Sequence, residues 1–242
     1  MTPITPANAI EAVRKNLDEQ GLNESVMYND ENADNDSMDS IIAKTLPEAI
    51  NEIHRIAPVY LLEGDSLIER NDNQESESSS SSQSESSNFS QQDVSISGRV
   101  LLFSVPDTCL RLAAFQAADS DIVVTDVIPE ASAEGRKQLN PYIRGTYDNP
   151  RMVKVQGKGG PMSFRYYSLK DSSFDNHPID AISRLEVIYQ AVYNDQAGAS
   201  YQASTELVDS IMYQLTAMVL AIYGQAEMAN YFTQKALKWK TS

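Results

Sequence analysis

The apolar residues of this chain recur with a helical period near both ends and with a strand period in the middle, and this change of period constrains the fold most. From Val94 onward, short β-branched or aromatic runs are separated by Pro, Gly, Asp and Asn. Helical spacing returns after His177. The order of helices, strands and helices contains no βαβ alternation and predicts helices combined with a small sheet.

Two helices are predicted before the strands. In the first, Thr5 can cap the N-terminus, Pro6 suits the first turn and Gly21 ends the helix. Its apolar face contains Ile10, Val13 and Leu17.

The second predicted helix is longer and contains a proline. Asp36 or Ser37 can cap it. Pro47 should kink the helix or split it in two, and Pro58 should end it. Its apolar residues at helical spacing are Ile41, Ile42, Leu46, Ala49, Ile50, Ile53 and Ala57.

Strand-like runs follow, and they predict a small sheet of mostly antiparallel strands. The runs are VSISGRVLLFSV, TCLRLAAFQA, DIVVTDVI, RMVKVQ and MSFRYYSL. The sequence GKGGP at residues 157–161 lies between the last two runs and predicts the turn of a hairpin.

After His177, the runs PIDAISRLEVIYQAVYN and STELVDSIMYQLTAMVLAIYG are predicted to be helices, and a terminal helix ends in KWKTS. The predicted fold class is α+β, mainly α: a helical bundle with a small, mostly antiparallel β domain inserted between N-terminal and C-terminal helices. The expected parts of this one structural unit are residues 1–70 (N-terminal helices), 71–93 (acidic Ser/Glu-rich loop), 94–170 (β domain with the hairpin) and 171–242 (C-terminal helices and basic tail).

The tract ESESSSSSQSESSN at residues 75–88 has no aliphatic or aromatic side chain, so it has too little apolar surface to offset the entropy of ordering. We expect an exposed loop. It is either a neutral insertion or a segment that becomes ordered against a neighbouring molecule.

Net charge is −15, and residues 1–93 hold most of it, with 19 acidic and five basic residues. Because no basic stripe exists to neutralise phosphates, tight nucleic-acid binding is not expected. No run of 18 apolar residues and no signal-like N-terminus is present, so we expect neither a membrane span nor secretion. The single cysteine, Cys109, is expected to be a small buried hydrophobe in a reducing compartment.

Sequence motifs for catalysis or metal binding are weak. The loop containing Asp30, Asp34 and Asp36 alternates oxygen ligands, but Asn35 and Ile41 stand where an EF-hand needs Gly and Glu. A solvated, helix-capping acidic loop is the alternative. The two histidines, His54 and His177, stand in no HExxH-like or triad-like setting and are expected to be structural. We therefore expect no catalytic residue, metal or cofactor.

The C-terminal tail is the candidate binding element. Lys235, Lys238, Trp239 and Lys240 place an aromatic ring and three cations at the end of the last helix. These residues either dock onto a partner or compensate the charge of the helix end.

Several stretches together resemble the head-to-tail connector proteins of short-tailed bacteriophages, also called adaptor, ring or tail tubular A proteins, and among these they most resemble the ring proteins of the crAss-like group. The stretch Val105–Leu112, VPDTCLRL, resembles that family's recurring Leu-Pro-Asp-Asp motif at the start of a strand. The helix SIIAKTLPEAINEIHRIAP and the closing AEMANYFTQKAL resemble its second and last helices. The Ser/Glu insertion departs from the family pattern.

The resemblance implies a structural virion protein and no enzyme. About twelve copies would form a ring below the portal, around a channel through which DNA passes without specific binding. The tail from Lys235 to Ser242 would contact the portal, and the ring would present a platform for further tail proteins. Asp30, Asp34 and Asp36 would face the DNA channel or solvent. Assembly would take place in the cytoplasm of the host bacterium.

Two other classes of function remain open at the level of sequence. One is an enzyme or small-molecule-binding domain whose site is built from scattered residues, and the other is a cytoplasmic interaction module.

Overall fold

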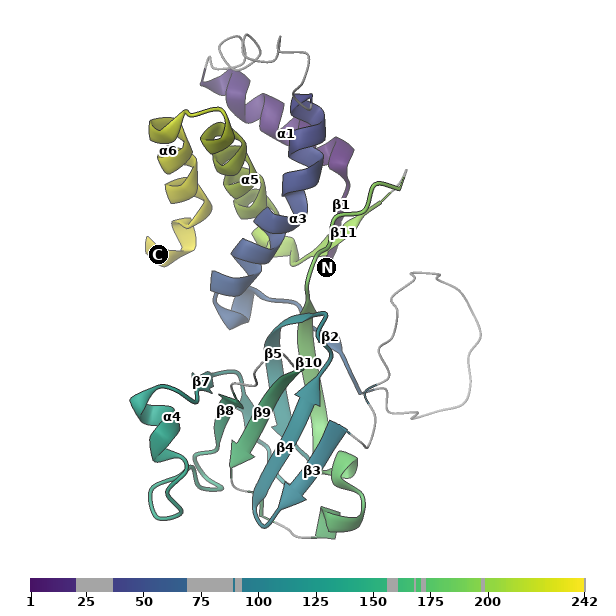
Figure 1. Cartoon of the computed structure of the whole chain (residues 1–242), viewed down its shortest axis with the longest axis vertical. Coiled ribbons are helices and arrows are strands. Elements are labelled where there is room, and N and C mark those ends of the chain that lie inside the picture. The colour runs from purple at the N-terminus through teal and green to yellow at the C-terminus, as the bar shows by residue number, and fades with distance from the viewer. Residues whose placement is uncertain are drawn as a thin grey trace. The chain divides into compact units, whose positions relative to one another are not determined.

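The computed structural model describes residues 1–20, 37–68, 89, 93–155, 161–167, 169–170, 173–196 and 199–241. The Ser/Glu tract at 75–88 and most of the predicted turn at 157–161 lie outside these residues. The chain divides into two compact units. Residues 1–63 and 190–242 form one, and residues 64–189 form the other (Figure 1).

The described residues of the first unit, the helical unit, form four α-helices and a two-stranded sheet. The helices are α1 (Pro6–Glu19), α3 (Met38–Ile56), α5 (Val208–Ile222) and α6 (Ala226–Ala236). Strand β1 (Thr2–Ile4) pairs antiparallel with β11 (Tyr201–Ala203). Helix α5 contacts α1, α3 and α6, so it is the central helix of this unit (Figure 1). Short 3-10 turns cover Val59–Leu61, Thr205–Leu207 and Lys238–Thr241.

The predicted caps of the first two helices are confirmed. The Thr5 hydroxyl accepts a hydrogen bond from the Asn8 N–H at 3.2 Å, and the Ser37 hydroxyl accepts one from the Ser40 N–H at 3.3 Å. The predicted split at Pro47 is wrong, because α3 runs through it as one helix of 19 residues. Leu46 and Ile50 are buried on either side of the proline, so packing holds the helix across the missing hydrogen bond.

One stretch of the helical unit, Thr205–Ile222, is long and apolar enough to cross a membrane, with a mean hydropathy of 1.2. Its buried residues are part of the core of the unit, and a core helix meets the same criterion.

The second, the sheet unit, has two sheets in the part of the chain that the structure describes. One has the strand order β2-β10-β5-β6, and the other has the order β3-β4-β9-β8-β7. The strands are β2 (Asp65–Ser66), β3 (Val94–Ser97), β4 (Val100–Val105), β5 (Cys109–Ala117), β6 (Val123–Val124), β7 (Val127–Pro129), β8 (Arg151–Val155), β9 (Met162–Tyr167) and β10 (Ile182–Tyr189). All pairs are antiparallel except β7 with β8. Helix α4 (Ala133–Lys137) follows β7, and 3-10 turns cover Ser173–Asn176 and Pro178–Ala181.

The two sheets of this unit share one core. Along β4, Leu101, Phe103 and Val105 are buried and alternate with more exposed residues, as expected for a strand with one inward face. The ring of Phe103 stacks on Phe115 of the other sheet, with centroids 5.1 Å apart. Aromatic packing therefore joins the sheets.

The prediction of a mainly helical fold is wrong. Of the described residues, 42% are helical and 28% are in strands, arranged in three sheets and five α-helices. The clearest error is the helix predicted after His177, where the chain forms strand β10. Three register shifts interrupt the pairing of β10 with β5, so its apolar residues do not alternate strictly and their spacing resembles a helix.

The predicted hairpin is confirmed, since β8 and β9 pair antiparallel from Arg151↔Tyr167 to Val155↔Ser163.

Candidate interaction surfaces

The predicted tail lies at the end of α6, where Lys235 is held by aromatic rings. Its Nζ lies 5.1 Å from the ring centroids of Tyr213 and Tyr231 and 5.6 Å from that of Phe232. Tyr213 belongs to α5, and its ring stacks on Phe232 with centroids 6.2 Å apart. The cation is therefore fixed over an aromatic cluster that spans two helices.

The other predicted tail residues differ in burial. Trp239 is half-buried and packs against the core of the helical unit, and its indole N–H is buried with no acceptor among the described residues. Lys238 is exposed. The side chain of Lys240 lies outside the described residues. The end of α6 thus combines an anchored tryptophan with an exposed cation, an arrangement that can dock onto an acidic or aromatic partner.

The predicted acidic residues Asp30, Asp34 and Asp36 all lie outside the described residues.

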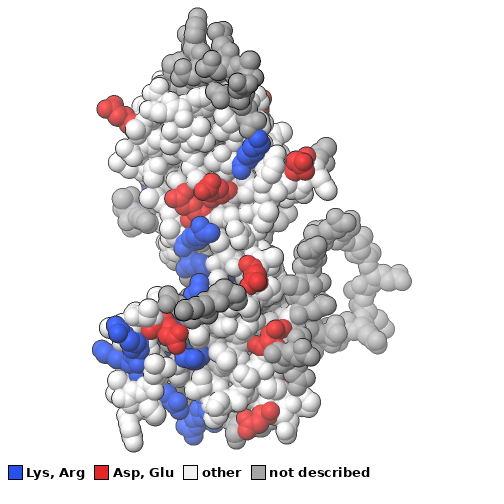
Figure 2. Space-filling view, viewed as in Figure 1, with Lys and Arg blue, Asp and Glu red and all other residues white. Residues whose placement is uncertain are grey.

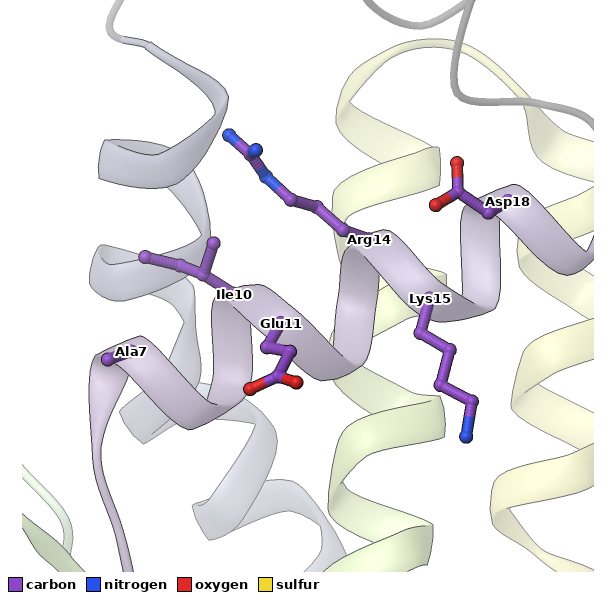
Figure 3. A pocket seen from close by; sticks show the side chains of 6 residues that line it. All are labelled: Ala7, Ile10, Glu11, Arg14, Lys15 and Asp18. Atoms are coloured by element: carbon purple, nitrogen blue, oxygen red, sulfur yellow. The ribbon is translucent and has the colours of Figure 1, made fainter.

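A shallow groove runs along α1 in the helical unit (Figure 3). Arg14 and Asp18 lie on one side of the helix, whereas Glu11 and Lys15 point to the other side. Arg14 is already engaged by both carboxylate oxygens of Asp39, at 2.8 and 3.0 Å. The charges neither converge on one point nor share one sign, so the groove selects no ligand class.

The sheet unit has a half-open pocket of about 220 Å³. Its charged lining residues are Arg111 on β5, Asp126 before β7 and Lys154 on β8. Burial lowers the pKa of Arg111, and the nearby Asp126 carboxylate opposes that shift. Since a carboxylate already lies beside the cations, this pocket alone does not define a substrate.

A third surface follows α4, and the sequence reasoning missed it. Leu139, Tyr142 and Ile143 are 56%, 95% and 56% exposed. The side chains of Arg136 and Lys137, at the end of α4, are exposed beside them in the sequence, and Arg144 is half-buried. We call these six residues the loop surface.

The position of α4 is fixed by its N-terminus. The Ser132 hydroxyl accepts from the Gly135 N–H at 2.9 Å and donates to the Pro129 carbonyl at 2.7 Å. A Cβ at position 135 would lie 2.2 Å from that carbonyl, so only glycine allows α4 to approach the end of β7 this closely.

The loop after α4 has a defined conformation. The Gly145 N–H donates to Oε1 of the buried Gln138 at 2.7 Å, which ties the two ends of the loop together. Within it, the Asn140 side chain accepts from the Tyr142 N–H at 3.0 Å. The Asn140 carbonyl accepts from the N–H groups of Ile143 and Arg144, at 3.2 and 3.0 Å. The exposed apolar side chains are thus held outward by specific bonds.

The charge of this region could have indicated the surface. Residues 136–165 contain seven Lys or Arg and one acidic residue, Asp148, within a chain of net charge −15. Figure 2 shows Lys and Arg side chains gathered over the part of the sheet unit where α4 lies.

The two histidines and the cysteine lie in different surroundings. His54 is buried in α3, and His177 is exposed before the turn at Pro178–Ala181. Cys109 is buried in the core of the sheet unit, as predicted, and burial raises its pKa to about 11, so its thiol is a poor nucleophile. The searched, described residues contain no group of three or more His, Cys, Asp or Glu side chains placed to hold a metal ion.

No protein-family model matches this sequence, and no curated protein matches it.

Proposed function

We propose that this chain is a structural virion protein: a subunit of a head-to-tail connector ring that docks below a portal, forms part of the DNA channel and presents a platform to further tail components. The ring would contain about twelve copies and would be assembled in the host bacterial cytoplasm. It would act mechanically, without a cofactor.

The observation that carries the proposal is the presence of two different apolar and cationic surfaces, one on each compact unit. The end of α6 belongs to the helical unit, and the loop surface belongs to the sheet unit. A closed ring needs head-to-tail contacts between unlike surfaces, and docking onto a portal needs a further contact. A subunit with several separate binding surfaces suits such an assembly.

The stretch that resembles the connector family has a defined place in the fold. Within Val105–Leu112, the Cys109 N–H donates to the Pro106 carbonyl at 2.9 Å and closes a turn. At this turn the chain leaves β4 in one sheet and begins β5 in the other. The motif therefore forms the corner that joins the two sheets, a structural role that agrees with a scaffold protein.

The DNA-channel part of the proposal concerns the acidic residues. Neutralising Asp30, Asp34 and Asp36 by substitution with Asn should slow genome ejection if these carboxylates keep the channel from adhering to DNA phosphates. An unchanged rate of ejection would remove this role.

Cryo-EM of the native particle tests the proposal as a whole. Density for about twelve copies of this chain next to a portal is the expected result. Absence of the chain from purified virions, or its presence at one or two copies, would refute the connector assignment.

A further inference from the structure

The loop surface combines exposed apolar side chains with an ordered backbone, which are the properties of a binding surface. Three large apolar side chains project from a loop whose backbone is fixed by the Gln138–Gly145 and Asn140–Tyr142 hydrogen bonds. Because the loop is already ordered, binding costs little further conformational entropy. The exposed cations Arg136 and Lys137 lie beside them in the sequence, so a fitting ligand combines apolar side chains with negative charge.

The same chain contains a segment with this chemistry. Residues 21–36 read GLNESVMYNDENADND and hold five acidic residues and no Lys or Arg. An apolar run, Val26 to Tyr28, directly precedes the acidic stretch. The order of apolar residues and then carboxylates complements a surface that offers both apolar side chains and cations.

We propose that the loop surface binds residues 21–36 of a second copy of this chain. This inference rests on the proposed function, because a ring of identical subunits needs each copy to offer two unlike, complementary surfaces. Apolar contacts would supply affinity, and the charges would set orientation and the rate of association. For Asp30, Asp34 and Asp36 this contact is an alternative to the DNA-channel role, because it would neutralise their carboxylates between subunits; the ring itself does not depend on the channel role.

The first test measures the contact itself. A labelled synthetic peptide of residues 21–36 is titrated, by fluorescence anisotropy at low salt, into the full chain carrying Asp30→Asn, Asp34→Asn and Asp36→Asn, which weakens competition from its own segment. We expect saturable binding that weakens at least about tenfold when Arg136→Glu and Lys137→Glu are added, and also when Tyr142→Ala is added.

Two exposed residues outside the loop surface provide matched controls. Arg99→Glu reverses a charge in the same unit, and Tyr60→Ala removes a 78% exposed tyrosine from the helical unit. Neither should change the affinity for the peptide. Absence of peptide binding, or equal weakening by the controls, would overturn the proposal.

The second test asks whether the contact joins two copies. One chain carries Arg136→Glu and Lys137→Glu, and another carries Asp30→Lys, Asp34→Lys and Asp36→Lys. Each alone should stay monomeric. A mixture, at concentrations about ten times the Kd of the peptide, should form a heterodimer through its one remaining pair of wild-type surfaces, measured by sedimentation velocity. Peptide binding without a heterodimer would show that the segment binds within its own chain and would reject the second copy as partner.

These results separate the inference from the proposed function. A ring in the particle without peptide binding would retain the connector and discard this contact. Peptide binding and heterodimer formation by a chain absent from virions would retain the contact and discard the connector.

Discussion

At the scale of single residues, His54 shows how burial sets a chemical property. The side chain is 3% exposed, and desolvation lowers its pKa to about 4 from 6.5. The folded state therefore favours the neutral imidazole. Protonation of His54 in the unfolded chain stabilises that chain and so lowers the free energy of unfolding.

We predict that the helical unit loses stability on mild acidification. Below pH 6.5 the unfolded chain protonates His54 and the folded chain does not, so the free energy of unfolding falls as the pH drops towards 4. At pH 5 the loss relative to pH 7 should be about 2 kcal/mol. The measurement is urea unfolding by circular dichroism at both pH values.

The control separates His54 from other groups. His54→Gln should flatten the pH dependence between pH 7 and 5, because it removes the group whose pKa burial lowers. The N-terminal amine and Thr205 lower the pKa of Glu63 to about 2, so its contribution is lost mainly below pH 4.5, outside this window. An unchanged slope in His54→Gln would contradict the assignment.

Asn51 gives a second prediction at this scale. Its buried amide donates to the Ala191 carbonyl at 2.8 Å and accepts from the Ala191 N–H at 2.8 Å. Asn51→Leu leaves both backbone groups without these bonds, and we expect a loss of about 2–4 kcal/mol in the free energy of unfolding. Glu48→Leu, at an exposed position of the same helix, should change it by less than about 0.5 kcal/mol. Similar losses in the two variants would show that the hydrogen bonds contribute little.

Local roles of residues were predictable, and non-local ones were not. Thr5 was identified as a cap and Ser37 as one of two candidates, because a cap binds a backbone group three residues away. Lys235 was identified as a tail cation, but the sequence did not show that Tyr213 of another helix holds it. The exposure of Tyr142 likewise depends on how the loop folds back through Gln138, although the basic charge of residues 136–165 was visible.

At the scale of elements, the sequence predicted helices better than strands. Helices α1, α3, α5 and α6 each have buried apolar residues at helical spacing, and that spacing is preserved along their length. Strand β10 was predicted to be a helix because its register shifts break the period of two. The underestimate of the sheet followed from that error and from short strands outside the predicted runs, such as β2, which has two residues, and β1 and β11, which have three each.

The end of α6 gives a prediction that separates stability from docking. Lys238→Glu reverses an exposed charge and, under the proposed docking of this end onto a portal, should weaken portal binding. Trp239→Ala removes a half-buried ring from the core of the helical unit and should cost about 1–3 kcal/mol. Thermal unfolding and pull-down with the portal measure the two effects, and unchanged portal binding by Lys238→Glu would argue against docking through this end.

At the scale of the whole molecule, one unit is inserted into the sequence of the other. The sheet unit is a single segment, residues 64–189, whose ends pair in neighbouring strands through Asp65↔Val187. The helical unit is assembled from the residues before and after it. Each unit has its own core cluster.

This connectivity predicts that residues 64–189 fold alone. Their ends already lie in adjacent strands, and the stacked core of Phe103 and Phe115 lies wholly within this segment, so excision leaves both intact. We expect the excised unit to be monomeric, to unfold cooperatively and to give a dispersed NMR spectrum. A chain in which a short Gly/Ser linker joins Glu63 to Gln190 should retain the helical circular dichroism of the other unit.

If both units fold alone, the peptide of residues 21–36 should bind the excised sheet unit as tightly as the full chain, because the whole loop surface lies within it. A sheet unit that unfolds on excision would mean that the two units stabilise each other, and peptide binding would then have to be assigned in the full chain alone.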